Sequence, residues 1–425
     1  MMTFQATLDF ARSLDRQDPL AGFRDRFHIP PAQDGSPSVY FCGNSLGLQP
    51  KSTREYVLAE LDDWARLGVE GHTHARHPWM PYHEFLTEKM ARVVGAKPRE
   101  VVVMNSLTVN LHLMMVSFYR PTTKRRKIVL EYSPFPSDRY AVASQLRYHG
   151  FDPVEDLIEL QPRQGSDQVL YEDLETLLEE EGHQIALLLI GGVNYYTGQA
   201  YDLRRITALG HRYGCMVGFD LAHAAGNLPL QLHDDGPDFA AWCSYKYLNS
   251  GPGSLSGVFV HERHANHPAM PRFEGWWGQD KDTRFLMPDT FTPIQGAEGW
   301  QLSNPPILPM AAMRASLDLF DEAGMEALVK KSAQLTGYLE YVIDDLSATT
   351  GTRLEIITPR DPAQRGCQLS VVLHGKGRQL FDALSARGVV ADWREPNVIR
   401  MAPVPLYNSF EDVYRFGTIL KEVIQ

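Results

Sequence analysis

A chain of 425 residues, 44% hydrophobic and 22% charged, is too long for one ordinary hydrophobic core, so two domains are expected. The net charge of −11 argues against a nucleic-acid or membrane-surface partner, because both require a basic patch. No apolar run is long enough to span a membrane and the N-terminus has no apolar signal core, so we expect a cytoplasmic protein.

The first 50 residues indicate a short helix and then a Pro-rich loop. Residues 53–68 and 82–95 have apolar residues at helical spacing and predict two helices. From about residue 100, apolar strands alternate with helices; the strands are predicted at 101–104, 127–132, 157–160, 185–193 and 215–220. This alternation predicts an α/β domain whose mostly parallel central sheet is flanked by helices.

The pattern changes after about residue 305. A long helical run over 311–346 is followed by short strands and two more helices, which predicts a smaller α+β domain. We therefore divide the chain into an N-terminal segment, 1–50, that packs with the small domain, a large domain, 51–305, and a small C-terminal domain, 306–425.

Polar residues follow the apolar strands at five places. In an open parallel sheet, ligands gather at the carboxyl ends of the strands, so these sets should lie near one another. They are Asn105–Thr108, Phe135–Asp138, Asn194–Thr197, Asp220–His223 and Tyr245–Lys246.

Lys246 and Asp220 indicate a cofactor. Each closes an apolar stretch, and a Gly-rich turn follows the lysine. Such a pair suits pyridoxal phosphate: the lysine would form an imine with the aldehyde, and the carboxylate would keep the pyridine nitrogen protonated. An aspartate near a lysine is also often a plain salt bridge.

The neighbouring residues have both functional and structural interpretations. Leu107 and Thr108 open a helix after Ser106, which suits a phosphate or simple N-capping. Phe135 could stack on a cofactor ring or belong to the core, and His223 could bind an anion or simply pack. The chain has no GxxxxGK[ST], GxGxxG after a strand, or GxSxG motif, which disfavours nucleotide sites of those types and a serine hydrolase.

Cysteine and histidine give no metal signature. The four cysteines lack CxxC pairing, which suits a reducing compartment. Two histidine groups lack both HExxH and a cysteine partner, so we expect no metal site; they are His72, His74, His77, His261, His264 and His267.

The chain resembles the kynureninase family, pyridoxal-phosphate enzymes of fold type I. The resemblance covers nearly the whole length, and its motifs occur in the family's order: GNSLGLQP (43–50), MNSLTVNLHLMM (104–115), FPSD (135–138), YTGQ (196–199), VGFDLAHAAGN (217–227), WCSYKYLNSGPG (242–253), RFEGWWG (272–278), SNPPIL (303–308) and RMAPVPLYNSFEDVYRF (400–416).

The resemblance implies residue roles. Lys246 would be the imine lysine and Tyr245 a proton relay, with Arg400 binding the amino-acid carboxylate. The matching cofactor-binding positions are Leu107, Thr108, Phe135, Pro136, Ser137, Asp138, Asp220, His223, Tyr245, Lys246, Trp276 and Asn304. Trp276 and Asn304 would come from the partner subunit of a homodimer. Where relatives carry serine before GVxxYTGQ, this chain has Gly191, so one polar cofactor contact is expected to be missing or replaced.

The implied reaction is hydrolytic cleavage of the Cβ–Cγ bond of a kynurenine to L-alanine and an anthranilate, in tryptophan catabolism or NAD biosynthesis. Ser45, His72 and Asn304 align with residues that surround the ring hydroxyl in relatives acting on 3-hydroxykynurenine. A site with polar groups aimed at a hydroxyl penalises the substrate that lacks it, so we expect 3-hydroxykynurenine to be preferred. For His72, ordinary loop packing is an equal alternative.

Two other functions remain open. A cysteine desulfurase or selenocysteine-lyase-like enzyme of the same fold would need a nucleophilic cysteine on a mobile loop, and Cys42 is the nearest candidate although it lies in an apolar segment. A non-catalytic sensor on the same fold would need an appended partner or DNA-binding domain, for which we see no spare segment.

Overall fold

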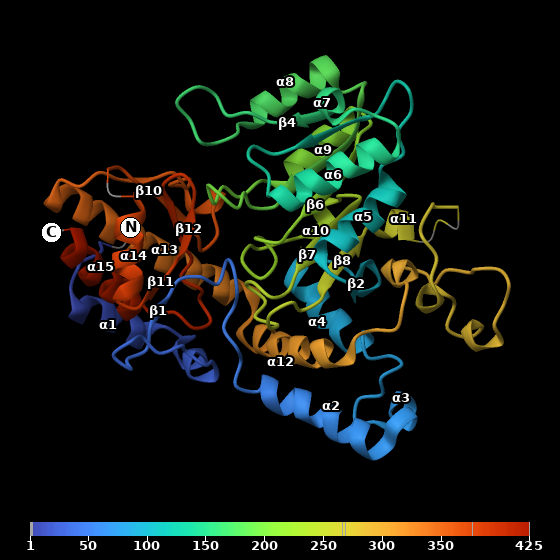
Figure 1. Ribbon diagram of the computed structural model, residues 1–425, viewed down its shortest axis with the longest axis horizontal. Helices are drawn as coiled ribbons and strands as arrows, with labels where there is room; N and C mark the ends of the chain where they lie inside the picture. The colour runs from blue at the N-terminus through green and yellow to red at the C-terminus, as the bar shows by residue number, and fades with distance from the viewer. Residues whose placement is uncertain (1–2, 266, 268, 376, 425) are drawn as a thin grey trace.

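A computed structural model describes residues 3–265, 267, 269–375 and 377–424. The chain forms two bodies that lie side by side, a large one around a seven-stranded sheet and a small one that contains both termini (Figure 1). No described helix is both long and apolar enough to cross a membrane.

The large body is built on a sheet with strand order β2-β8-β7-β6-β5-β3-β4. Its strands are β2 (Val101–Met104), β3 (Lys127–Leu130), β4 (Leu157–Glu159), β5 (Ile185–Gly191), β6 (Met216–Asp220), β7 (Phe239–Cys243) and β8 (Ser256–Val260). The two pairs that contain β8 are antiparallel and the other four pairs are parallel, so the mostly parallel sheet predicted from the sequence is present. Every residue of β5 is buried, as expected for a strand covered on both faces.

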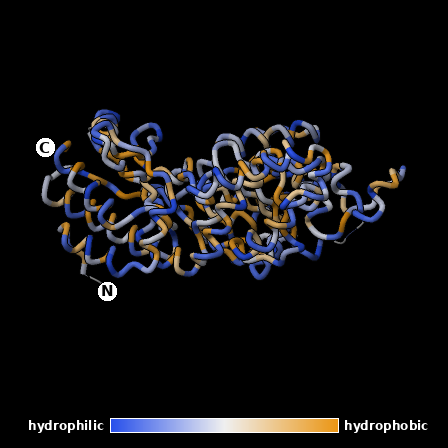
Figure 2. The backbone as a smooth tube through the Cα atoms, turned by 90° about the horizontal axis from the view of Figure 1, so that it is seen from below, coloured by the Kyte–Doolittle hydropathy of each residue, from blue (hydrophilic) through white to orange (hydrophobic). Residues whose placement is uncertain are grey.

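Helices cover the sheet on both sides (Figure 1). The longer ones are α2 (Thr53–Leu67), α4 (Glu84–Val94), α5 (Leu107–Phe118), α6 (Pro136–Tyr148), α8 (Tyr171–Glu181), α9 (Leu203–Arg212) and α12 (Ile307–Ala323). Single turns are α3 (Gly71–His74), α7 (Pro153–Asp156), α10 (Leu232–Asp235) and α11 (Glu262–Ala265). Apolar segments run through the middle of this body, where the buried strands lie (Figure 2).

The small body holds a four-stranded antiparallel sheet with order β12-β13-β10-β9. The strands are β9 (Leu354–Ile356), β10 (Leu369–Leu373), β12 (Asp392–Arg394) and β13 (Val398–Met401), and the helices are α13 (Met325–Thr350), α14 (Gly377–Ala386) and α15 (Phe410–Ile424).

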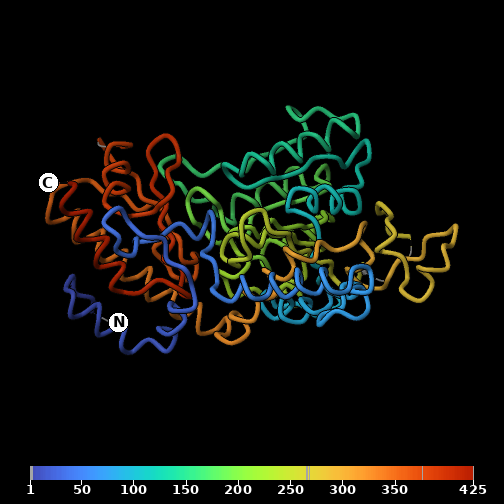
Figure 3. The backbone as a smooth tube through the Cα atoms, turned by 60° about the horizontal axis from the view of Figure 1, so that its bottom comes forward, coloured from blue at the N-terminus to red at the C-terminus, as the bar shows by residue number. Residues whose placement is uncertain are grey.

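The N-terminal segment lies against the small body (Figure 3). Ala11 and Leu14 of α1 (Leu8–Gln17) share a hydrophobic core with α13 and α15, and β1 (Val39–Tyr40) pairs in parallel with β11 (Val389–Val390). In contrast, α12 packs against α2 and α4 in the core of the large body. The core of the large body therefore includes α12 and Leu328 at the start of α13, and the core of the small body begins at Leu335 of the same helix.

Candidate active site

A cavity of about 220 Å³ lies at the carboxyl ends of the central parallel strands. Residues from all five predicted polar sets line it, together with three residues outside those sets, Glu131, Gly191 and Val193. The lining consists of Ser106, Leu107, Thr108, Glu131, Phe135, Ser137, Asp138, Gly191, Val193, Tyr195, Asp220, Ala222, His223, Tyr245 and Lys246.

Lys246 and Asp220 come together because their strands are parallel neighbours. Asp220, the last residue of β6, is in register with Ala241 of β7, and Lys246 follows shortly after β7 ends. The GNSLG segment packs against this turn: the N–H of Gly47 donates to the carbonyl of Tyr245 at 2.9 Å. A Cβ at Gly47 would meet the carbonyl oxygen of Lys246 at 2.3 Å, so glycine is required for this approach.

His223 is the direct partner of the lysine. Its Nε2 lies 3.0 Å from Lys246 Nζ. Burial, and then the charge of Lys246, hold the pKa of His223 well below its usual value, so the ring is neutral and Nε2 accepts from the lysine. Its buried Nδ1 has no hydrogen-bond partner among the described residues, and such a donor is costly unless a ligand supplies an acceptor.

Asp138 and Asp220 form a buried carboxyl pair in the cavity wall. Burial raises both pKa values, and the neighbouring Asp220 raises the pKa of Asp138 further, well above its ordinary range. Two adjacent carboxyl groups cannot both ionise at low cost. Asp138 is therefore the protonated member and donates to Asp220, whose Oδ1 also accepts from the N–H of Ala222 at 2.7 Å.

Two hydroxyl groups also line the cavity. Thr108 is the second residue of α5 and Ser137 the second residue of α6, and their hydroxyl oxygens are 2.8 Å apart. Two helix N-termini with converging hydroxyl groups suit a phosphate dianion. The rings of Phe135 and Tyr245 also line the cavity, with their centroids 5.8 and 5.9 Å from Lys246 Nζ.

Glu131 is a cavity residue that the sequence reasoning missed. Its Oε2 accepts from the N–H of Gly191 at 2.9 Å, and a Cβ at Gly191 would lie 2.7 Å from Oε1. A carboxyl group thus lies against Gly191, the position at which one polar cofactor contact is expected to be missing or replaced. Burial raises the pKa of Glu131 to about 7. The sequence could have indicated Glu131 as a cavity residue, because it directly follows the apolar strand β3.

Six predicted site residues do not line this cavity: Ser45, His72, Pro136, Trp276, Asn304 and Arg400. Trp276, in η4 (Trp276–Gly278), is 41% exposed, and Asn304 is exposed just before α12. His72 lies in α3, where its Nδ1 is 2.9 Å from the carbonyl of Val69. The loops that carry η4 project from the large body (Figure 1).

Arg400 does not line the cavity but is hydrogen-bonded to Tyr195, which does. It is 1% exposed, and its Nη1 donates to the carbonyl of Tyr195 at 2.6 Å, while Nη2 bonds Asp392. Its buried Nε has no partner among the described residues. A guanidinium group with an unpartnered Nε, bonded to a residue that lines the cavity, is suited to a carboxylate.

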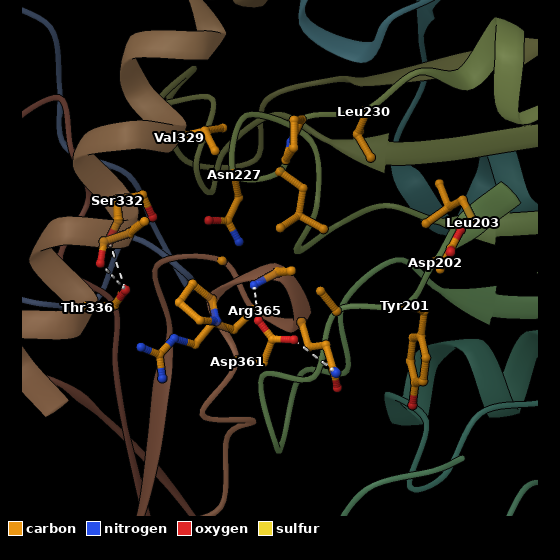
Figure 4. Close-up of a pocket in the computed structure, with 18 of the residues that line it drawn as sticks. Tyr201, Asp202, Leu203, Asn227, Leu230, Val329, Ser332, Thr336, Asp361 and Arg365 are labelled. Carbon is orange, nitrogen blue, oxygen red and sulfur yellow. Dashed lines mark hydrogen bonds between the residues drawn. The ribbon is translucent and has the colours of Figure 1, made fainter. Parts of the chain in front are cut away.

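A larger cavity, of about 530 Å³, lies between the two bodies (Figure 4). Its polar side chains are bonded to their own neighbours: Thr336 donates to the carbonyl of Ser332, and Asp361 accepts from the N–H of Ala363. None of the lysine, histidine and carboxyl groups described above lines it. The smaller cavity is therefore the candidate active site.

The fold and the site define a fold type I enzyme of the pyridoxal-phosphate class. A cysteine desulfurase from Escherichia coli superposes with a TM-score of 0.75 at 17% identity, covering 95% of this chain and 98% of that one. This likeness confirms the predicted fold class.

The particular family follows from the sequence comparisons. Residues 328–420 match the model of the kynureninase C-terminal domain. Kynureninases from Myxococcus xanthus and Koribacter versatilis are 61% and 59% identical, covering 98% and 97% of this chain and 97% of each relative. The chain belongs to the kynureninase family, as its motifs predicted, and the expected enzyme class, a pyridoxal-phosphate-dependent hydrolase acting on a carbon–carbon bond, is confirmed.

Proposed function

We propose that the protein hydrolyses the Cβ–Cγ bond of a kynurenine to give L-alanine and an anthranilate. The observation that carries this proposal is the contact between Lys246 and neutral His223 in a cavity that also holds Asp220. Family membership supports the substrate class.

The residues of the cavity fit pyridoxal phosphate. Lys246 would hold the aldehyde carbon, Asp220 the pyridine nitrogen, and Thr108 and Ser137 the phosphate, with Phe135 over the ring. The unpartnered Nδ1 of His223 and the converging hydroxyl groups are the observations that support this fit. When bound, the cofactor supplies an electron sink for the carbanion formed at the substrate α-carbon.

The chain's own groups perform the proton transfers. Lys246 removes the proton from the α-carbon as a free amine, and His223 can orient it because its neutral ring accepts from Nζ. Burial raises the pKa of the Tyr245 phenol, which therefore stays protonated and can donate. Arg400 binds the substrate carboxylate through its open Nε edge.

The properties of Cys42, the candidate nucleophile, disfavour the desulfurase alternative. Burial raises the pKa of the Cys42 thiol to about 11, so it is protonated at neutral pH, whereas a nucleophilic cysteine must be a thiolate. Likeness to a desulfurase at 17% identity concerns the fold alone.

Purified holoenzyme should convert kynurenine to anthranilate and L-alanine in equal amounts. We further expect kcat/KM to be about tenfold or more higher for 3-hydroxykynurenine, because polar groups left without their hydroxyl partner weaken binding of the plain substrate. Absorbance assays of the two substrates measure both quantities.

Replacing His72 by phenylalanine should remove that preference while plain kynurenine is still cleaved. Clear preference of the unaltered enzyme for plain kynurenine would overturn the specificity proposal. Sulfide release from cysteine without cleavage of either kynurenine would overturn the function itself.

We infer a homodimer with shared active sites. The ring of Trp276 contacts that of exposed Phe285, and the next two residues, Leu286 and Met287, are exposed as well; a second subunit would cover these apolar side chains. Together with exposed Asn304, this patch accounts for the predicted cofactor-binding residues that do not line the cavity of their own chain.

Subunit mixing tests the shared site. A Lys246→Ala protomer and a Trp276→Ala/Asn304→Ala protomer should each be inactive as homodimers, and re-associated mixtures should recover about a quarter of the native activity, because half of the dimers have one intact site. Mixtures without any recovery, or a monomeric mass by light scattering, would contradict the proposal.

The domain division and the location stay proposals. The two cores support a large domain that includes α12 and a small domain beginning near Gly324. The free thiols of all four cysteines are consistent with the reducing cytoplasm expected from the sequence.

A further inference from the structure

Two strands of the small body bring three charged groups together behind the cavity. Asp392 of β12 is in register with Arg400 of β13. Its Oδ2 accepts from Nη2 of Arg400 and, at 3.0 Å, from Nη2 of Arg394. The side chain of Asp392 is 12% exposed and that of Arg394 is 35% exposed, so the group extends from the interior toward solvent.

The group carries one unbalanced positive charge. Two guanidinium groups and one carboxylate leave a net charge of about +1, because arginine does not lose its proton in proteins. The group is also close to the reacting centre. After burial and Lys246, the charges of Arg400 and Arg394 are further causes of the low pKa of His223.

Both arginines have an unused donor. The buried Nε atoms of Arg394 and Arg400 have no hydrogen-bond partner among the described residues. Nη1 of Arg400 is held by the carbonyl of Tyr195, which lines the cavity, so the guanidinium plane is fixed. A fixed guanidinium plane with an unpartnered N–H donor can receive one further acceptor.

We propose that Asp392 and Arg394 are positioning residues that orient Arg400 and set its effective charge, so that the site selects an amino acid with one free carboxylate. This inference rests on the proposed function and extends it to substrate selection. Asp392 fixes the plane of Arg400, and Arg394 offsets the negative charge of Asp392. One positive charge then remains for the substrate carboxylate.

Each residue has a distinct expected effect. Arg394→Gln leaves Asp392 to neutralise Arg400, so a carboxylate should bind about tenfold more weakly. Asp392→Asn raises the net charge of the group to about +2, so a carboxylate should bind at least as tightly, while kcat falls because Arg400 loses its orientation. Arg394→Gln with Asp392→Asn returns the net charge to about +1 and should bring binding within about threefold of the native value.

The experiment uses the holoenzyme with L-alanine, the expected product, and L-alaninamide, which lacks the negative charge. Isothermal titration calorimetry measures both Kd values for the native protein, the two single variants and the double variant, and kinetics with kynurenine separates KM from kcat. Alaninamide binding should not follow the charge changes. Arg394→Lys keeps the charge and should keep native alanine binding within about threefold.

A purely structural salt bridge predicts the opposite pattern. In that case the double variant would bind alanine no better than Arg394→Gln, or alanine and alaninamide would weaken together, and either result overturns the inference. If Arg394→Gln does not fold, the double variant is compared with Asp392→Asn instead. These two proteins differ only by the loss of the Arg394 charge, and the double variant should bind alanine about tenfold more weakly than Asp392→Asn. Native protein that neither binds alanine nor cleaves kynurenine would instead refute the proposed function.

Discussion

Replacing Lys246 by alanine should abolish steady turnover of kynurenine, with kcat falling by at least about 10⁴-fold. Lys246 carries the amine among the residues that line the active-site cavity, and its Nζ is held by His223 at 3.0 Å. On the proposed assignment, the substitution would remove both the attachment of the cofactor and the base at the α-carbon. Single-turnover and steady-state assays with kynurenine measure the loss.

A chemical label distinguishes this role from a loss of fold. Borohydride treatment of the native holoenzyme, followed by peptide mapping, should tag the peptide that contains Lys246, and the variant should carry no tag. Lys124→Ala, which changes an exposed lysine, is the matched control and should keep native activity and labelling. A tag at another lysine, or sustained turnover by the Lys246 variant, would refute the assignment.

The position of the site could be predicted from the sequence because parallel strands bring their carboxyl ends together. Asp220 and Lys246 follow adjacent strands, β6 and β7, and Phe135 follows β3, so one rule places all three. The rule that strand ends carry the site holds only in part for residues 194–197. There Tyr195 lines the cavity, whereas the Asn194 side chain accepts from the N–H of Thr197 and stabilises a turn.

Other features depend on tertiary contacts that no local pattern encodes. Glu131 is a cavity residue because the strand ends at Leu130 and turns its carboxyl group toward Gly191. The pairing of Asp392 with Arg400 depends on the register of β12 and β13, which sequence spacing does not determine. Which core α12 joins is not encoded in its own sequence either, because the helix is as apolar as a core helix of either body and only its packing neighbours place it in the core of the large body.

Asp220→Asn should lower kcat by about 10²- to 10³-fold, whereas Asp138→Asn should lower it by about tenfold or less. Asp220 is assigned as the ionised member of the buried pair and as the proposed partner of the pyridine nitrogen, and an uncharged amide there would not keep a positive charge on that nitrogen. Asp138 is the protonated member, because burial and the neighbouring Asp220 raise its pKa well above the ordinary range. An amide retains its hydrogen-bond donor and nearly its shape.

The two isosteric substitutions change the same carboxyl pair, so their comparison separates charge from packing. Thermal unfolding should show similar stability for both variants, and absorbance titration with pyridoxal phosphate should show the larger loss of cofactor affinity for Asp220→Asn. Equal losses of kcat in the two variants would mean that the negative charge is shared across the pair. A larger loss for Asp138→Asn would place the charge on Asp138 and reverse the assigned protonation states, because the group that tolerates a neutral amide is the one that was already neutral.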